Sequence, residues 1–126
     1  MNPVKEADDL GLLYTLHSDC PITPISPLFS VWAAVNRLTR DGIVLGADQR
    51  IDVETALKSM RSFGAELNFE EDEIGSLEVG KYADLVVLDQ DPTAIDPIKI
   101  KDIQILSTII NGEVVYEKAE VEFALK

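Results

Sequence analysis

Cysteine and histidine each occur once in this chain of 126 residues, as Cys20 and His17. A single cysteine allows no internal disulfide, which fits a cytoplasmic protein in a reducing compartment. A structural zinc site needs four ligands, which are almost always cysteines and histidines, and this chain has only two such residues. We therefore expect neither a disulfide framework nor a structural zinc site.

Basic residues are also scarce, with 11 Lys and Arg against 23 Asp and Glu and a formal net charge of -12. A surface of this charge repels phosphate backbones and anionic lipids, so we expect no nucleic-acid partner and no membrane partner. No apolar run approaches the roughly 18 residues of a membrane-spanning helix. The first residues, MNPVKEADDLGLLY, lack the basic flank and apolar stretch of a secretory signal.

The length of 126 residues is too small for a complete (β/α)₈ barrel, which needs about 250. The hydrophobic content of 46% is nevertheless sufficient for one packed core. A short helix is predicted over 3–10, ended by Gly11. The apolar segment 12–16 predicts a strand buried on both faces, as in a parallel sheet.

Two longer helices are predicted next, each from a capping residue and an apolar stripe. Ser26 as N-cap and Pro27 at the first helical position predict a helix over 27–40, with Gly42 just beyond its end. Asp52 as N-cap predicts a second helix over 52–63. The apolar stripe of the first helix recurs at helical spacing: Leu28, Val31, Trp32, Val35 and Leu38.

The second half of the chain predicts antiparallel strands. The apolar segments 83–89 and 103–110 read as strands, and Asn111-Gly112 is a strong signal for a two-residue hairpin turn before a strand over 113–116. The tail after Tyr116 fits either a strand or a short helix. Three strands make a thin sheet with open edges, so we expect self-association to a dimer.

The segment LHSDCPITP, residues 16–24, brings four reactive side chains together. A nucleophile pair of Cys20 and His17 lacks an orienting Asn or Asp, and a triad with Ser18 is disfavoured because neighbours on a strand point to opposite faces. Two interpretations of Asp19 stay open, a functional acid at the carboxyl end of a strand or a turn carboxylate. His17 is interpreted as a core or supporting residue in preference to a reactive one, and Cys20 is interpreted as a packed, inert thiol.

Four stretches together resemble the C-terminal end of the amidohydrolase superfamily: GLLYTLHSDCPITPISPLFSVWAAVNRLT, IDVETALKSM, GSLEVGKYADLVVLDQDP and ILSTIINGEVVY. The resemblance is greatest to the branch that includes N-acyl amino acid deacylases and formamide hydrolases. It implies that 12–16 is the last strand of an incomplete (β/α)₈ (TIM) barrel, that 27–40 and 52–63 are the helices after it, and that 83–116 belongs to a composite β-sandwich.

The resemblance thus implies an α/β plus β fold, with the end of the barrel in 1–70 and part of the sandwich in 71–126. It also implies a C-terminal fragment of a metal-dependent enzyme that hydrolyses C–N bonds in small amides or N-acyl compounds. Asp19 would be a metal ligand and general base there, with His17 as a supporting residue. The full-length enzyme would hold a divalent metal, zinc by our expectation, whereas this fragment alone would bind none and be inactive.

Two other hypotheses stay open from the sequence. One is a non-catalytic, acidic structural or interaction module that keeps the family's β-domain. The other is a thiol enzyme that uses Cys20, which needs a reactive, low-pKa thiolate.

Overall fold

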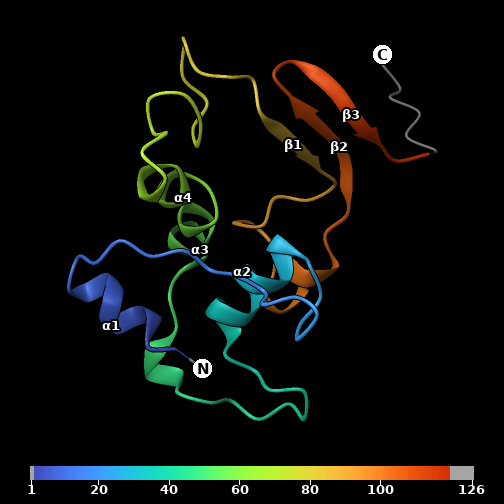
Figure 1. Ribbon diagram of the computed structural model, residues 1–126. Coiled ribbons are helices and arrows are strands. Elements are labelled where there is room, and N and C mark those ends of the chain that lie inside the picture. Colours follow the sequence, from blue (N-terminus) through green and yellow to red (C-terminus); the bar gives the residue numbers. More distant parts are fainter. Residues whose placement is uncertain (1, 120–126) are drawn as a thin grey trace.

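The computed structural model describes residues 2–119, and the alternatives left for the tail beyond 119 lie outside them. In Figure 1 the three strands lie together at one end of the molecule, away from the first helix. No helix among these residues is long and apolar enough to cross a membrane. The elements are α1 (Val4–Asp9), α2 (Pro27–Asn36), α3 (Val53–Ser59), α4 (Ser62–Leu67), β1 (Leu85–Leu88), β2 (Ile105–Ile110), β3 (Glu113–Glu117) and the 3₁₀ helices η1 (Ala47–Gln49) and η2 (Pro97–Asp102).

The strand predicted over 12–16 is wrong for this chain, because this segment runs as irregular backbone between α1 and α2 (Figure 1). A strand needs a neighbour to receive its N–H and C=O groups. The described residues offer none, and the amide of Leu12 instead bonds the carbonyl of Ala7 at 2.9 Å. The apolar composition of 12–16 is that of a buried strand, but composition alone does not supply the neighbour that a strand needs.

Helix α2 begins as predicted and ends earlier than predicted. The Ser26 hydroxyl accepts the amide of Phe29 at 3.3 Å, and Pro27 occupies the first turn. The helix stops at Asn36 because Arg37 adopts a left-handed conformation with φ 58°. Leu38 therefore leaves the apolar stripe and forms an isolated bridge with Val44.

The helix predicted over 52–63 is two helices. Asp52 is the N-cap, and its carboxylate accepts the backbone amide and the hydroxyl of Thr55, each at 2.8 Å. The backbone leaves the helical region at Arg61, with φ -133° and ψ -83°, and α4 starts at the next residue. The loop at Gly75 packs against the start of α4, so a tertiary contact lies beside the break between α3 and α4.

The sheet has the three predicted strands, and the predicted hairpin joins the last two. Strands β1, β2 and β3 pair antiparallel in that sequence, with Val86 opposite Thr108 and Thr108 opposite Tyr116. Asn111 and Gly112 form the turn between β2 and β3, with φ 50° and 81°. Positive φ at both positions is what a hairpin turn of two residues requires.

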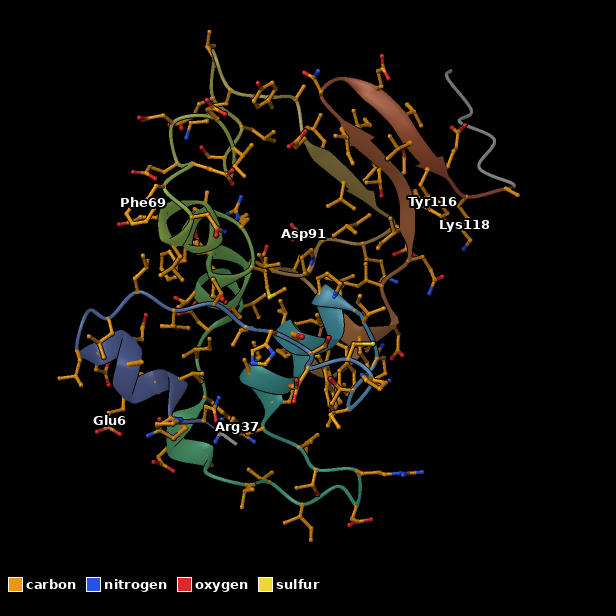
Figure 2. The ribbon with its side chains drawn as sticks, viewed as in Figure 1. Glu6, Arg37, Phe69, Asp91, Tyr116 and Lys118 are labelled. Carbon is orange, nitrogen blue, oxygen red and sulfur yellow. The ribbon has the colours of Figure 1, made fainter. Side chains whose placement is uncertain are left out.

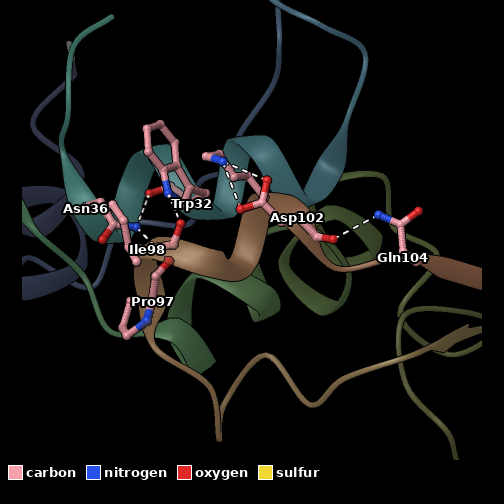
Figure 3. Close-up of polar contacts among 7 residues, drawn as sticks. Trp32, Asn36, Pro97, Ile98, Asp102 and Gln104 are labelled. Carbon is pink, nitrogen blue, oxygen red and sulfur yellow. Dashed lines mark hydrogen bonds and ion pairs between the residues drawn. The ribbon is translucent and has the colours of Figure 1, made fainter. Parts of the chain in front are cut away.

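One core holds the helices and the start of the sheet region together. Trp32 on α2 donates to the carbonyl of Ile98 on η2, and Asn36 donates to the carbonyl of Pro97 at 3.0 Å (Figure 3). The core therefore continues across the boundary predicted between residues 70 and 71. Its buried members are Leu28, Val31, Trp32, Ala34, Val35, Ile51, Ala56, Ile100 and Ile103.

Candidate functional site

A hollow of about 530 Å³ lies between the segment after α1 and one side of α2. Residues of the reactive segment form one wall, and Phe29, Ser30 and Ala33 of α2 form the other. Both candidate site residues, His17 and Asp19, line this hollow. The remaining lining residues are Asn2, Val4, Thr15, Leu16, Ser18, Ile22, Thr23, Ala34 and Arg37.

Asp19 is exposed, and its backbone is fixed at both ends. Its amide donates to Nδ1 of His17 at 3.2 Å, and its carbonyl accepts the amide of Ile22 at 2.8 Å. The φ angle of Asp19 is 50°, a left-handed conformation that Asp tolerates better than most side chains. Among residues 2–119, no hydrogen bond or ion pair reaches its carboxylate, so this group is available to a ligand.

The rest of the segment is a braced turn. The Thr23 hydroxyl donates to the carbonyl of Ser18, and the Cys20–Pro21 peptide is cis. Cys20 is a free, exposed thiol, which corrects its interpretation as a packed residue. The turn has no interior position for it, because Pro21 and Ile22 are exposed as well.

His17 is exposed and adjoins Asp19 through its amide, which favours the supporting role over that of a core residue. An Nδ1 atom that accepts this amide is not free to bind a metal at the same time. In the described part of the chain, no three His, Cys, Asp or Glu side chains come together as a group that could hold a metal ion. The residues present therefore do not fit a metal by themselves, and Asp19 could supply one ligand at most.

Arg37 lines the same hollow, and the sequence pattern did not single it out. Its side chain is only 5% exposed. Nε donates to the carbonyl of Leu45 at 3.1 Å, and Nη1 donates to that of Asn2 at 2.8 Å. In Figure 2 Arg37 lies between the start of the chain and the turn after α2. It ties two loops together, a role that a helical pattern cannot show.

Tyr14 lies just before the reactive segment and packs edge-on against Phe63, with ring centroids 5.9 Å apart. Its hydroxyl is buried and has no hydrogen-bond partner within ordinary geometry among residues 2–119. Burial, together with the negative charges of Asp8 and Asp52, raises the pKa of Tyr14 to about 12. The hydroxyl is thus neutral at physiological pH and contributes no charge near the site.

Comparison with known proteins gives a consistent result. The model of a family described as the amidohydrolase family matches residues 1–116. The chain is 34% identical over 116 residues to an N-substituted formamide deformylase of Arthrobacter pascens, covering 92% of this chain and 21% of that protein. It is 35% identical over 112 residues to a Bacillus subtilis protein named as amidohydrolase YtcJ, covering 86% of this chain and 21% of that one.

A solved structure shows a similar fold. An amidohydrolase from Thermotoga maritima superposes with a TM-score of 0.70 at 24% identity, over 91% of this chain and 26% of that one. The chain spans about a fifth of the length of the curated relatives it matches.

Proposed function

The chain belongs to the amidohydrolase family, and from this premise we propose that it is the C-terminal part of a metal-dependent enzyme hydrolysing C–N bonds in small amides or N-acyl compounds. One of its relatives is named as a deformylase of N-substituted formamides, which is a reaction of this class. Because the chain spans about a fifth of its curated relatives, the activity is proposed for the whole protein and the chain alone is proposed to be inactive.

Asp19 is the residue that we propose acts in the reaction, as general base and as one metal ligand. The observation that carries this proposal is its free carboxylate on the rim of the hollow, held there by a backbone that is bonded on both sides. A carboxylate in this position can take a proton from an attacking water and return it to the leaving nitrogen. A positioned acid or base contributes about 10²- to 10⁴-fold to a rate.

A divalent metal, zinc in our proposal, would need further ligands that the described residues do not provide. In the whole protein these ligands would come from segments that this chain does not contain. In this proposal His17 supports Asp19 and is not a metal ligand, since Nδ1 accepts the Asp19 amide and Nε2 then carries the ring proton.

The fold proposed for the whole protein rests on the same family membership. Segment 12–16 pairs in the whole protein as the last strand of a TIM barrel, which explains an apolar strand pattern that forms no strand here. Residues 1–70 belong to that barrel and residues 71–126 to a small composite β-sandwich. We also propose a cytoplasmic location, because Cys20 is an exposed free thiol that a reducing compartment protects.

The chain produced by itself is proposed to self-associate, as a dimer. In the sheet formed by residues 2–119, strand β3 is an edge whose residues are all exposed, and an open edge invites pairing with another chain. Three of its exposed side chains are large and apolar: Val114, Val115 and Tyr116.

The test of the enzymatic role uses the protein expressed from the complete reading frame that contains this sequence. Its metal content is measured by mass spectrometry and its hydrolysis of an N-substituted formamide is assayed. We expect Asp19→Asn to lower kcat/KM by about 10²-fold or more. Cys20→Ser is the matched control and should leave the rate unchanged, since a thiol mechanism is not proposed.

Two results would contradict the proposal. An Asp19→Asn protein with full activity would remove Asp19 from the reaction. Stoichiometric zinc and amide hydrolysis by the chain of 126 residues alone would show that the site is complete without further segments.

A further inference from the structure

We propose that His17 is a positioning residue, whose Nδ1 atom holds the backbone of Asp19 in the conformation that presents its carboxylate to the hollow. The inference rests on the proposed function only in the statement that Asp19 is the group that acts. The contact between the two residues is a separate claim about the chain.

The hydrogen bond defines the state of the imidazole. Nδ1 accepts the Asp19 amide at 3.2 Å, so Nδ1 carries no proton in this arrangement. A neutral imidazole has one acceptor and one donor nitrogen, which places the proton on Nε2. The geometry thus selects one tautomer and leaves the Nε2–H group as a donor.

Asp19 needs such a restraint because its φ of 50° is unfavourable for a residue with a side chain. The neighbouring bonds restrain other atoms: Ile22 bonds the carbonyl of Asp19, and Thr23 bonds the carbonyl of Ser18. Within residues 2–119, the His17 ring is the partner of the Asp19 amide itself. Loss of this bond would therefore release the amide side of the turn while the carbonyl side stays bonded.

Exposure argues that His17 is not there for packing. Its side chain is exposed, whereas the buried core belongs to α2 and residues that pack on it. A side chain of this kind can be replaced with little effect on the core, which makes its hydrogen bond testable by itself.

Two substitutions distinguish the ring nitrogens. In His17→Asn the amide oxygen falls near the position of Nδ1, and an Asn oxygen readily accepts the backbone amide two residues later. In His17→Gln the oxygen lies farther out, nearer the position of Nε2. His17→Ala removes both ring nitrogens. The Asn variant should therefore keep the hydrogen bond to the Asp19 amide that the Ala and Gln variants lose.

The experiment is amide hydrogen exchange of Asp19, measured by NMR in the chain of 126 residues for the wild type and the three variants. We expect the Asp19 amide to exchange on the order of five-fold faster in the Ala and Gln variants, corrected for intrinsic rates, and to stay protected in the Asn variant. The ¹⁵N shifts of the wild-type ring at pH 8 should show Nδ1 unprotonated. Circular dichroism identifies any variant that loses its fold. If His17→Ala does, the difference in Asp19 amide exchange between His17→Asn and His17→Gln tests the hydrogen bond.

Equal exchange in all four proteins, or a ring with its proton on Nδ1, would overturn the inference. Neither result would affect the role of Asp19, which the activity of Asp19→Asn tests separately. Conversely, an active Asp19→Asn enzyme would end the proposed function and leave the His17 contact in place. In the whole protein, kcat should follow the same order, with the Asn variant above the Gln and Ala variants and KM unchanged.

Discussion

The indole Nε1–H group of Trp32 donates a hydrogen bond of 2.9 Å to the carbonyl oxygen of Ile98, 66 residues later in the chain. Trp32 is buried, and its ring stacks on Phe29 with centroids 5.4 Å apart. This bond joins α2 to η2, and Asn36 adds a second link to the same 3₁₀ helix (Figure 3). The helical half and the sheet half are thereby attached at the core.

Trp32→Phe should lower the free energy of unfolding by about 1–3 kcal/mol, since the carbonyl of Ile98 loses its donor and a smaller ring leaves space. Urea unfolding followed by circular dichroism measures the change, because the substitution removes the one Trp whose fluorescence would otherwise report unfolding. Phe69→Leu is the control at a side chain that is 91% exposed (Figure 2) and should change stability by less than about 0.5 kcal/mol. An unchanged midpoint for Trp32→Phe would show that the bond does not contribute.

Gly75→Ala should destabilise the chain more than Gly80→Ala. Both glycines have positive φ, 87° and 97°, so both substitutions carry the cost of a left-handed backbone, about 1–2 kcal/mol. A Cβ at Gly75 would also lie 2.7 Å from the Cβ of Ala65, whereas nothing lies within 4 Å at Gly80. The difference in unfolding free energy between the two variants isolates the clash with α4, and equal values would contradict this packing.

Asp52 should contribute to stability in a pH-dependent way. The hydrogen bonds from Thr55 hold the pKa of the Asp52 carboxyl below its ordinary value of 3.8. A lowered folded-state pKa gives stability that is fully present above the unfolded value and is lost as pH falls below about 3.8 through the folded value. Asp52→Ala should cost about 1 kcal/mol at pH 7.

The matched variant for this cap is Asp52→Asn, which keeps an acceptor for the amide of Thr55 and removes the titration. Its stability at pH 7 should lie close to that of the wild type. Urea midpoints measured between pH 2 and 7 would show a smaller loss at low pH for Asp52→Asn, and parallel curves would contradict the assignment.

The isolated chain should form dimers across the micromolar range, measured by sedimentation velocity. With a net charge of -12, two copies repel each other, so added salt should strengthen association by screening this repulsion. Val115→Lys on the open edge strand β3 should shift the equilibrium towards monomer. A clean monomer at every concentration and salt level would contradict the proposed self-association.

Helix caps and turn residues predicted correctly the elements whose hydrogen bonds are made within a few residues of the chain. Ser26 and Asp52 cap their helices as predicted because a short polar side chain satisfies an amide two or three residues away. Asn111-Gly112 makes its turn because both residues tolerate positive φ. The strands follow from such turns and from apolar runs, and their ends differ from prediction by only one or two residues.

The predicted elements that differ from the structure depend on contacts with residues far away in the sequence. Segment 12–16 has the composition of a buried strand, yet a strand forms only where a neighbour accepts its hydrogen bonds. Helix α2 ends at Asn36 because Arg37 turns into a left-handed conformation and bonds the carbonyls of Leu45 and Asn2. Neither carbonyl could be identified from the periodicity of the helix.

The sequence by itself determined where the candidate acid stands, since Asp19 follows an apolar segment and precedes a proline-rich turn. Tertiary structure decided what surrounds it: the hollow against α2, the contact of the Asp19 amide with Nδ1 of His17, and the exposure of Cys20. The physical reason is that capping and turn formation are satisfied within a few residues, whereas burial and buried hydrogen bonds require groups that folding brings together from far apart in the chain.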